Sequence, residues 1–371
     1  MKTNFLGLPL KSPVIVAAGP WSRDGESIRR SLAAGVGAVI TETIVSEPII
    51  DVKPRIAFDG LGAQNIRLFS DVQIEGWERE MEIAKSNGGI VIANVSAHTP
   101  SELAYLAVKM EKYGADGIEL GLSTPMGVDL EVVASDPEEV YEMTRYVVEN
   151  VKIPVMVKLS QNVTNLSRVA KEVQRAGGAA VSAINAIRCV LGVDIDNMKP
   201  LLPTYGGYSG RPIKPLGLAS VASIAQTVDI PICGIGGIDS YENALEYIML
   251  GASAVQVGTA LMLKGRDYVR GIVEELDRWG QENRIDDVKE ICGKALEKLK
   301  SFEEIKIEPL ISHADNSIAC SADCNMCINA CMYGSLSRTK DGGIKTDSQC
   351  CTGCGLCTFV CEANKMRLDW L

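Results

Sequence analysis

The chain has 371 residues, of which 46% are hydrophobic and 23% are charged. This composition excludes disorder, collagen and coiled coil, and the length allows one large core plus a smaller module. The formal net charge of −10 gives no overall attraction to nucleic acid or anionic lipid. No apolar run approaches the roughly 18 residues of a membrane span, and residues 1–5 do not begin a secretion signal. We therefore expect a cytoplasmic protein that binds neither nucleic acid nor membrane.

The first 265 or so residues alternate short apolar runs with amphipathic stretches, which is the pattern of repeated strand–helix units on a parallel sheet. Eight strands, each followed by a helix, favour a closed (β/α)8 TIM barrel over an open doubly wound sheet, since such barrels take about 250 residues. The predicted strands are Val14–Ala18, Ala38–Ile44, Ile90–Val95, Gly117–Leu122, Val155–Leu159, Ala180–Asn185, Ile230–Ile235 and Ala254–Val257, and the predicted helices include Pro100–Tyr113, Pro137–Val151, Thr164–Ala176, Leu216–Thr227 and Tyr241–Leu250.

Four loops after these strands are candidates for function, because in such barrels the loops at the carboxyl ends of the strands carry the chemistry. Val45–Ser70 and Ala186–Pro215 are long, and both could fold over a ligand. Gly234–Ile238 and Val257–Ala260 are glycine-rich and follow the seventh and eighth strands. Glycines let backbone N–H groups approach an anion, so these two runs together predict a bound phosphate.

The sequence after the barrel divides into two parts. Residues 266–312 are strongly charged and helical in pattern, which predicts the last helix and a linker with a boundary near Glu308-Pro309. Residues 313–371 are rich in cysteine and turn formers, which predicts a small domain whose fold depends on metal. We therefore expect three segments, namely a barrel over 1–265, the linker and the cysteine-rich domain.

Nine of the 12 cysteines lie between Cys320 and Cys361. One run has the C-x2-C-x2-C-x3-C spacing of bacterial four-iron ferredoxins, and another has one extra residue in its first gap. In such runs three thiolates bind one [4Fe–4S] cluster and the fourth reaches the other cluster. Paired zinc sites are the alternative, although they normally show two separated C-x2-C pairs. The spacing assigns Cys320, Cys324, Cys327 and Cys361 to one cluster and Cys351, Cys354, Cys357 and Cys331 to the second.

Two residues depart from that ferredoxin pattern. Glu362 stands where ferredoxins usually have proline, and Cys350 is an additional thiol beside Cys351 that could be a spare or a substitute ligand. Clusters of this kind carry single electrons, so we expect a nearby group that exchanges electrons with them.

Several barrel motifs resemble those of one flavoprotein family. They are Ala17–Gly19, Val157–Thr164, Gly206–Gly210, Gly236–Asp239 and Gly251–Val257. Together they resemble the barrels of the dihydroorotate dehydrogenase and dihydropyrimidine dehydrogenase flavoproteins, and the similarity covers the barrel from end to end. A ferredoxin-like tail after the barrel is the arrangement of the dihydropyrimidine dehydrogenase branch.

The resemblance implies that the barrel binds FMN, with its ring against Ala18, Gly19 and Thr43. It also places Lys158, at the end of the fifth strand, near the N1 and O2 edge of the flavin. A fixed ammonium there would stabilise the negative charge of the reduced ring. The implied phosphate ligands are Ser209, Gly210, Gly236, Gly237, Gly258 and Thr259.

The substrate positions of the family are only partly kept in this chain. The catalytic base, a cysteine or serine in the family, falls on Thr124, with Ser123 as the alternative. An asparagine of the family falls on Gly121, and a threonine falls on Ala186. The positions that match polar substrate contacts are Asn65, Asn94 and Asn185.

The largest departure follows the second strand, where Glu42 replaces the lysine of the family's Thr-Lys-Thr motif. A carboxylate at this position would repel a substrate carboxylate. It would also oppose an anionic reduced flavin unless it is protonated or paired with Lys158. We therefore expect Glu42 to contact the substrate and dihydroorotate not to be that substrate.

The resemblance and the cysteines together predict an FMN-dependent oxidoreductase of the CH–CH class. A hydride would pass between the flavin and a small cyclic carbonyl substrate, as in dihydropyrimidine dehydrogenases, and two [4Fe–4S] clusters would relay the electrons. No further G-x-G-x-x-G nucleotide fingerprint follows a strand, so the expected partner is a ferredoxin or a separate nicotinamide-binding subunit, in a homo- or hetero-oligomer. The alternatives are a non-pyrimidine substrate, or an electron-transfer subunit without its own turnover.

Overall fold

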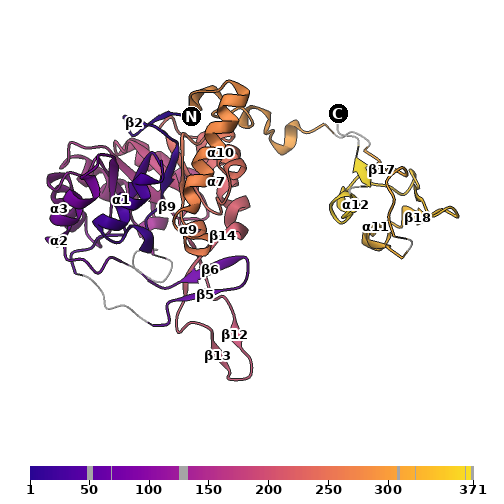
Figure 1. The fold of residues 1–371 in the computed structure, drawn as a ribbon, viewed down its shortest axis with the longest axis horizontal. Coiled ribbons are helices and arrows are strands. Elements are labelled where there is room, and N and C mark those ends of the chain that lie inside the picture. The colour runs from indigo at the N-terminus through magenta and orange to yellow at the C-terminus, as the bar shows by residue number, and fades with distance from the viewer. Residues whose placement is uncertain are drawn as a thin grey trace. The chain divides into compact units, whose positions relative to one another are not determined.

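A computed structural model describes residues 1–47, 53–67, 69–124, 133–306, 310–321, 323–363 and 365–368. The chain divides into two compact units, Met1–Leu299 and Lys300–Leu371, which are described one at a time (Figure 1). The boundary predicted near Glu308-Pro309 lies outside the described residues. In the described part of the chain, no helix is both long and apolar enough to cross a bilayer.

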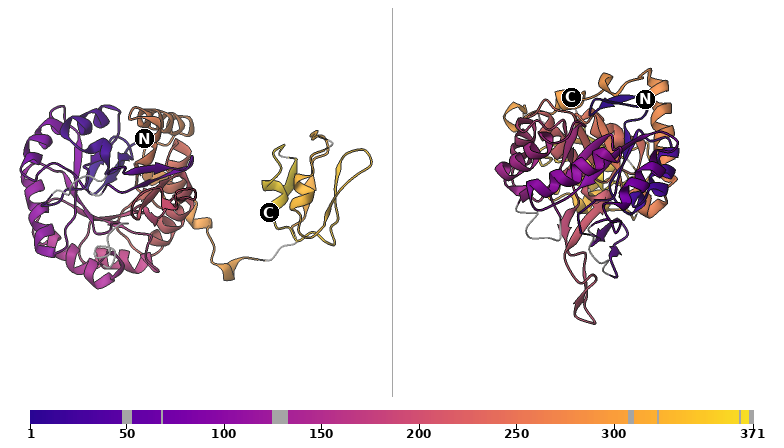
Figure 2. Two further views of the ribbon diagram at one scale, coloured as in Figure 1. Left: turned by 90° about the horizontal axis from the view of Figure 1, so that it is seen from below. Right: turned by 90° about the vertical axis from the view of Figure 1, so that its left-hand side faces the viewer.

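The first unit is a closed barrel of eight parallel strands surrounded by helices, which confirms the predicted (β/α)8 fold. The left view of Figure 2 looks along this barrel. Each strand pairs with the next barrel strand along the chain, and the ring closes where Val255 pairs with Val14. The strands are mostly buried because helices cover their outer faces. They are β3 (Val14–Val16), β4 (Ala38–Ile40), β7 (Ile90–Val95), β8 (Gly117–Gly121), β9 (Val155–Leu159), β10 (Ala180–Ala183), β15 (Ile232–Ile235) and β16 (Ala254–Val257).

Four strands end earlier than the sequence predicts, among them β3 at Val16 rather than Ala18 and β8 at Gly121 rather than Leu122. The ladder of β4 stops at Ile40 rather than Ile44, and that of β10 stops at Ala183 rather than Asn185. Beyond Ile40 the backbone N–H of Glu42 bonds to a carbonyl outside the barrel ladder. An apolar pattern reports burial but not strand pairing, so it does not reveal where the ladder ends.

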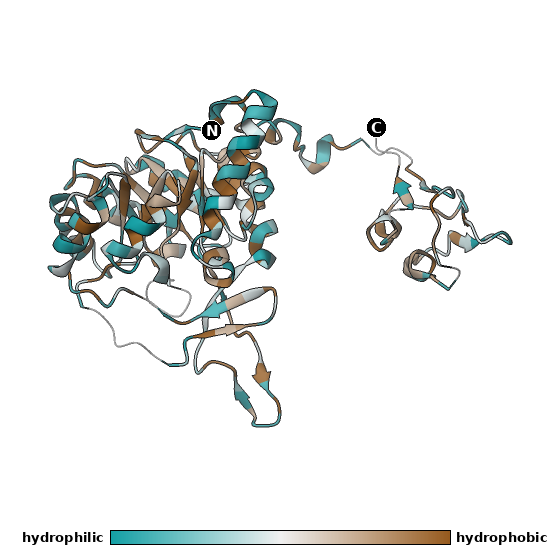
Figure 3. Ribbon diagram, viewed as in Figure 1, coloured by the Kyte–Doolittle hydropathy of each residue, from teal (hydrophilic) through white to brown (hydrophobic). Residues whose placement is uncertain are grey.

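Helices follow the barrel strands and form the outer ring, with hydrophilic residues along them and apolar strands at the centre (Figure 3). Several begin at capping side chains. Thr99 accepts from the N–H of Glu102, and Ser240 accepts from that of Asn243. The helices of this unit are α1 (Gly25–Ala33), α2 (Gly76–Lys85), α3 (Pro100–Lys112), α5 (Pro137–Val148), α6 (Leu166–Arg175), α7 (Lys214–Ala225), α8 (Tyr241–Met249), α9 (Thr259–Lys264) and α10 (Tyr268–Asn283), with short 3-10 helices η1 (Pro20–Ser22), η2 (Arg211–Ile213), η3 (Val288–Glu290) and η4 (Leu296–Lys298).

An amino-terminal hairpin closes one end of the barrel. Its strands β1 (Thr3–Phe5) and β2 (Leu8–Leu10) pair in antiparallel fashion. Phe5, Leu6 and Leu10 are buried in one apolar cluster with residues from the barrel strands. Because apolar side chains fill this end, the polar interior of the barrel lies toward the carboxyl ends of the strands.

The two long loops meet in one four-stranded antiparallel sheet, which we call the lid sheet. Gln64 is buried where they meet, donates to the Thr204 carbonyl at 3.1 Å and accepts from the N–H of Leu191 at 2.9 Å. A hairpin of β12 (Val193–Asp194) and β13 (Lys199–Pro200) extends beyond this sheet (Figure 1). In spatial order the lid sheet consists of β11 (Ile187–Cys189), β14 (Gly206–Gly210), β6 (Gly62–Asn65) and β5 (Ile56–Phe58).

The second unit contains two short antiparallel strand pairs and short helices. A small core combines cysteines with apolar side chains such as Leu336, Ile344 and Met366. The strand pairs are β17 (Ser312–Ala314) with β20 (Met366–Leu368) and β18 (Leu336–Arg338) with β19 (Ile344–Thr346), and the helices are η5 (Phe302–Glu304), α11 (Met326–Ala330) and α12 (Leu356–Phe359).

Tyr247 on α8 is a buried residue that connects the helix layer to the end of β15. Its hydroxyl donates to the Gly236 carbonyl at 2.7 Å and lies 3.2 Å from the Ile235 carbonyl oxygen. Tyr247→Phe removes this donor from a buried site, so we expect the free energy of unfolding in urea to fall by about 1–2 kcal/mol. Tyr146→Phe, at an exposed ring on α5, should change it by less than about 0.5 kcal/mol. If both substitutions lowered the free energy of unfolding equally, the buried hydrogen bond of Tyr247 would not be what stabilises the fold.

Candidate active site

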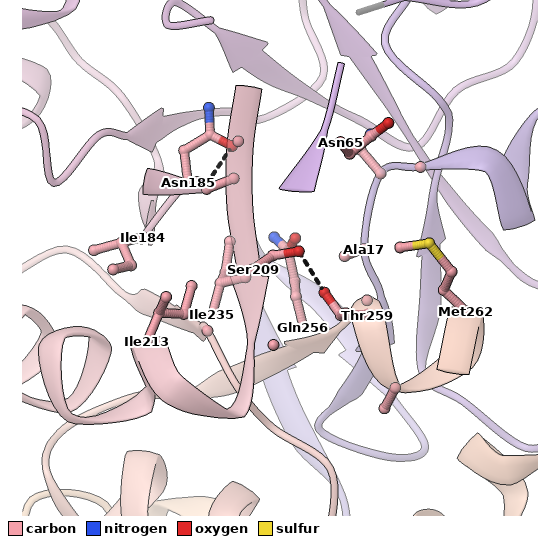
Figure 4. A pocket seen from close by; sticks show the side chains of 18 of the residues that line it. Ala17, Asn65, Ile184, Asn185, Ser209, Ile213, Ile235, Gln256, Thr259 and Met262 are labelled. Atoms are coloured by element: carbon pink, nitrogen blue, oxygen red, sulfur yellow. Dashed lines mark hydrogen bonds between the residues drawn. The ribbon is translucent and has the colours of Figure 1, made fainter. Parts of the chain in front are cut away.

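A large pocket opens at the carboxyl ends of the barrel strands, and residues of the lid sheet form part of its wall (Figure 4). The space between its atoms is about 1490 Å³ when the open mouth is included. Every catalytic, cofactor and substrate residue predicted in the barrel lines it. These residues are Ala18, Gly19, Glu42, Thr43, Asn65, Asn94, Ser123, Thr124, Lys158, Asn185, Ser209, Gly210, Gly236, Gly237, Gly258 and Thr259.

The loops predicted to bind phosphate are in contact with one another. Gly236 and Gly237 have φ values of +125° and +66°, which side chains other than glycine rarely adopt. A Cβ atom on Gly237 would lie 2.9 Å from the carbonyl oxygen of Gly210. Ser209 and Thr259 are joined by a hydrogen bond of 2.8 Å between their hydroxyls, which ties β14 to α9 (Figure 4). Three loops therefore converge on a region where backbone N–H groups and hydroxyls could surround an anion.

A fully buried carboxylate lies inside the barrel. Glu119 on β8 accepts hydrogen bonds from Asn94 Nδ2 at 2.6 Å, Ser182 Oγ at 2.7 Å and Gln256 Nε2 at 2.9 Å. These bonds direct both amide NH2 groups to Glu119 and leave Asn94 Oδ1 and Gln256 Oε1 buried without a hydrogen-bond partner among the described residues. A Cβ at Gly121 would lie 3.1 Å from Asn94 Oδ1. Both residues line the pocket, although these two oxygen atoms are themselves buried.

Lys158 stands at the pocket wall near the end of β9. It is half-buried, and its neighbours in the ladder are Gly121 on β8 and Ser182 on β10. Neither neighbour carries a charge, and the described residues place no carboxylate in ion-pair contact with Lys158. Its ammonium is therefore a cation that a ligand in the pocket could use.

Glu42 belongs to a buried ion pair. Its carboxylate accepts from Arg67 Nε at 2.7 Å and from Nη2 at 2.9 Å, and the side chains of Glu42 and Arg67 are only 4% and 8% exposed. Burial raises the pKa of the Glu42 carboxyl, and the Arg67 guanidinium opposes that rise. The exposed Asp71 lies 3.5 Å from Nη2 of the same guanidinium. The partner of Glu42 is thus Arg67 rather than Lys158.

The hydroxyl groups predicted for acid–base chemistry follow β8. Ser123 and Thr124 are both buried. Asn185 donates from Nδ2 to the Ser123 hydroxyl at 2.9 Å and lies 3.1 Å from the Ser123 carbonyl oxygen. The neighbouring Pro125, part of the motif, lies outside the described residues. A predicted substrate residue and a candidate base are therefore joined by a hydrogen bond.

In the second unit, one small cavity is lined by all four cysteines that we assign to the second cluster. Two of their sulfur atoms have hydrogen-bond partners of a kind that suits thiolates. Ser312 N–H lies 3.5 Å from Cys351 Sγ, and Ser335 Oγ lies 3.1 Å from Cys331 Sγ. Cys350 does not line this cavity. The lining cysteines are Cys331, Cys351, Cys354 and Cys357.

Three of the four cysteines assigned to the first cluster, Cys324, Cys327 and Cys361, lie near one another. Burial raises the pKa of the Cys327 thiol, and the neighbouring thiols of Cys361 and Cys324 raise it further. Cys361 Sγ accepts from the N–H of Lys365 at 3.3 Å. Cys320 is half-buried. Within the described ranges, no three His, Cys, Asp or Glu side chains are close enough to hold one metal ion. A four-iron cluster does not need such closeness, since each thiolate binds a different iron.

The structure adds residues in the pocket wall, and one carboxylate behind it, to which sequence reasoning gave no role. Glu119 and Gln256 interrupt otherwise apolar strands, and a polar residue inside a buried strand is a signal that could have found them. Arg67 gave no such signal, because it lies in a loop and becomes a site residue only through Glu42. Trp21 is another pocket residue to which sequence reasoning gave no role. Its ring packs so closely on Gly19 and Gly258 that a Cβ at Gly19 would collide with it.

Comparison with known proteins gives a consistent set of relatives. Residues 1–279 match the family described as dihydroorotate dehydrogenase. A Thermoplasma volcanium protein named dihydroorotate dehydrogenase B (NAD(+)), catalytic subunit, is 37% identical over 302 residues, which are 80% of this chain and 99% of that protein. Proteins of the same name from Pyrococcus abyssi and Methanocaldococcus jannaschii are 35% and 33% identical over 309 residues, covering 80% of this chain and 99% and 98% of those proteins.

Glu119→Gln tests the buried carboxylate. The new amide would turn an NH2 group toward at least one of three donors, so we expect the free energy of unfolding to fall by about 1–3 kcal/mol. Urea denaturation of the two proteins measures this change. Glu139→Gln, at an exposed carboxylate on α5, should change the value by less than about 0.5 kcal/mol. If the Glu119→Gln protein were as stable as the control, the three hydrogen bonds would not require a carboxylate at this position.

Proposed function

The chain belongs to the dihydroorotate dehydrogenase family and is an oxidoreductase acting on a CH–CH group. On that premise, we propose that it binds FMN and two [4Fe–4S] clusters and oxidises or reduces a C–C bond beside a carbonyl in a small cyclic substrate. The observation that carries this proposal is the meeting of the glycine loops, Lys158 and the Ser123–Asn185 pair in one pocket.

The pocket residues fit the parts of FMN. The loops at Gly210, Gly237 and Thr259 suit the phosphate, because their glycines keep the backbone open to an anion. The amides of Asn94 and Gln256 line the pocket and could offer hydrogen bonds to the polar edge of the ring. Bound FMN would supply a hydride donor and acceptor and would convert two-electron into one-electron chemistry.

The remaining chemistry falls to side chains of this chain. With FMN bound, the Lys158 ammonium would stabilise negative charge at the pocket wall where it stands. Thr124 or Ser123 moves the substrate proton, and Asn185 orients the Ser123 hydroxyl through its hydrogen bond. Strands of the lid sheet form part of the pocket wall and would cover one side of a bound ligand.

The cysteines of the second unit support an electron relay in the same chain. The cavity lined by Cys331, Cys351, Cys354 and Cys357 contains one complete predicted ligand set. Relatives named as the catalytic subunit of an NAD(+)-dependent enzyme support a separate partner that handles the nicotinamide. We propose that a nicotinamide-binding subunit or a ferredoxin exchanges electrons with these clusters, in a homo- or hetero-oligomer.

Metal and flavin analysis tests the cofactors. Protein purified without oxygen should contain one FMN and about eight irons, as two four-iron clusters require. Cys354→Ser should lower the iron content by up to half and leave FMN in place. Cys350→Ser is the matched control, since this thiol lies outside the cavity, and it should retain all the iron. Zinc in place of iron, or iron loss in both variants alike, would contradict the ligand assignment.

Lys158→Met tests the charge beside the flavin. With dihydrouracil as the probe, we expect the rate of flavin bleaching in anaerobic stopped flow to fall by about 100-fold, because one preorganised charge is removed. The FMN content should remain that of the unmodified protein. Lys171→Met, an exposed lysine on α6, serves as the control and should bleach at the original rate. An unchanged rate in Lys158→Met would remove this residue from the reaction.

A further inference from the structure

Lys365 is a buried cation in the second unit, beside the cysteines assigned to the first cluster. It is 3% exposed, and the other buried polar side chains described in this unit are neutral serines. Its backbone N–H donates to Cys361 Sγ at 3.3 Å, and its ammonium donates to the Ile318 carbonyl at 3.0 Å. Since Ile318 precedes Cys320 by two positions, Lys365 joins the segments that carry Cys320 and Cys361.

The charge of Lys365 is not cancelled by an ion pair. Its ammonium bonds to a neutral carbonyl, and the described carboxylates include none in ion-pair contact with it. Asp315 is a carboxylate on which this charge acts, although hydrogen bonds from Ser317 lower the pKa of Asp315 first, and Arg367 and Lys365 lower it further. A buried charge with a neutral partner acts strongly on its surroundings, because little water lies between them.

A second cation lies at the same group of cysteines. Arg338 is half-buried, and its guanidinium donates to the Cys324 carbonyl and, at 2.9 Å, to the Gly342 carbonyl. Two carboxylates are adjacent in sequence to these cysteines, Asp323 and Glu362, and both are exposed, so water and salt screen them. Positive charge therefore outweighs negative charge in the less solvated surroundings of the first cluster.

The second cluster has neutral surroundings. The described residues that line its cavity include no Lys, Arg, Asp or Glu. Its sulfur atoms interact with uncharged groups instead, since Ser312 N–H lies near Cys351 Sγ and the Ser335 hydroxyl lies near Cys331 Sγ. Two sets of four thiolates thus have unequal electrostatic surroundings.

We propose that Lys365 raises the reduction potential of the first cluster above that of the second. Reduction adds one negative charge to a cluster that its four thiolates already make anionic, and a buried cation stabilises the added charge. An electron that reaches either cluster therefore settles on the first one, until the nicotinamide-binding subunit or ferredoxin takes it up. This inference rests on the proposed function and deepens it by giving the two clusters an order. In this role Lys365 acts through the first cluster and is not a catalytic residue.

Redox titration of the FMN-loaded full chain, followed by EPR without oxygen, tests the proposal. The unmodified protein should show two one-electron cluster transitions at different potentials. At a fixed potential, Lys365→Met should lower the ratio of reduced to oxidised first cluster at least about tenfold, which is a fall of about 59 mV in the upper midpoint. The same ratio for the second cluster should change by less than about threefold. Lys345→Met, at an exposed lysine on β19, is the control and should leave both midpoints in place.

Two further variants separate the charge of Lys365 from its structural contacts and assign the transitions. Lys365→Gln keeps a donor for the Ile318 carbonyl without the charge, and it should give the same fall as Lys365→Met. Cys354→Ser should lose the second cluster and with it the lower transition.

Four results would overturn the inference. They are an unchanged upper midpoint in both Lys365 variants, an equal fall in Lys345→Met, loss of iron from both Lys365 variants, and loss of the upper transition in Cys354→Ser. Unmodified protein that contains zinc or no iron would instead contradict the proposed function.

Discussion

Closure of the parallel ring brings eight strand ends to one rim, and every feature of the pocket depends on that closure. The pairing of β16 with β3 places the first and last loops of the barrel side by side. Trp21 shows the consequence, since its ring packs against both Gly19 and Gly258. In an open sheet these glycines would lie at opposite edges. The hairpin of β1 and β2 fills the other end with apolar side chains, so among the described residues the polar interior of the barrel opens at the carboxyl ends of the strands.

Two carboxylates are buried near this rim, and the protein stabilises them in different ways. Glu119 is surrounded by three neutral donors, which leaves its charge uncancelled but fixes the orientation of Asn94 and Gln256. Glu42 is bound to Arg67, which cancels its charge. The first arrangement fixes two amides of the pocket wall, and the second pairs a carboxylate of the pocket with a guanidinium. Both arrangements therefore limit which polar and charged groups a ligand can place in the pocket.

The lid sheet explains why the two long loops are long. Each contributes two strands, and Gln64 joins them through hydrogen bonds to Thr204 and Leu191. Arg67 follows directly after β6, so its ion pair with Glu42 also fastens the lid sheet to the end of β4. The pocket is thus built on paired strands and a buried ion pair rather than on free loops, which favours a preorganised site.

The sequence by itself determined what depends on local spacing. Buried strands, capped helices, the cysteine runs and the glycine-rich turns all follow from residues within a few positions of each other, and the barrel was predictable from them. The strand ends at Ile40 and Ala183 were not, because pairing depends on the neighbouring strand. Only the tertiary structure decided that Gln256 meets Glu119 across 137 positions and that Arg67 neutralises Glu42. Such contacts form only when the ring closes and the two long loops pair in the lid sheet. The charge at the pocket wall is therefore a property of the folded chain.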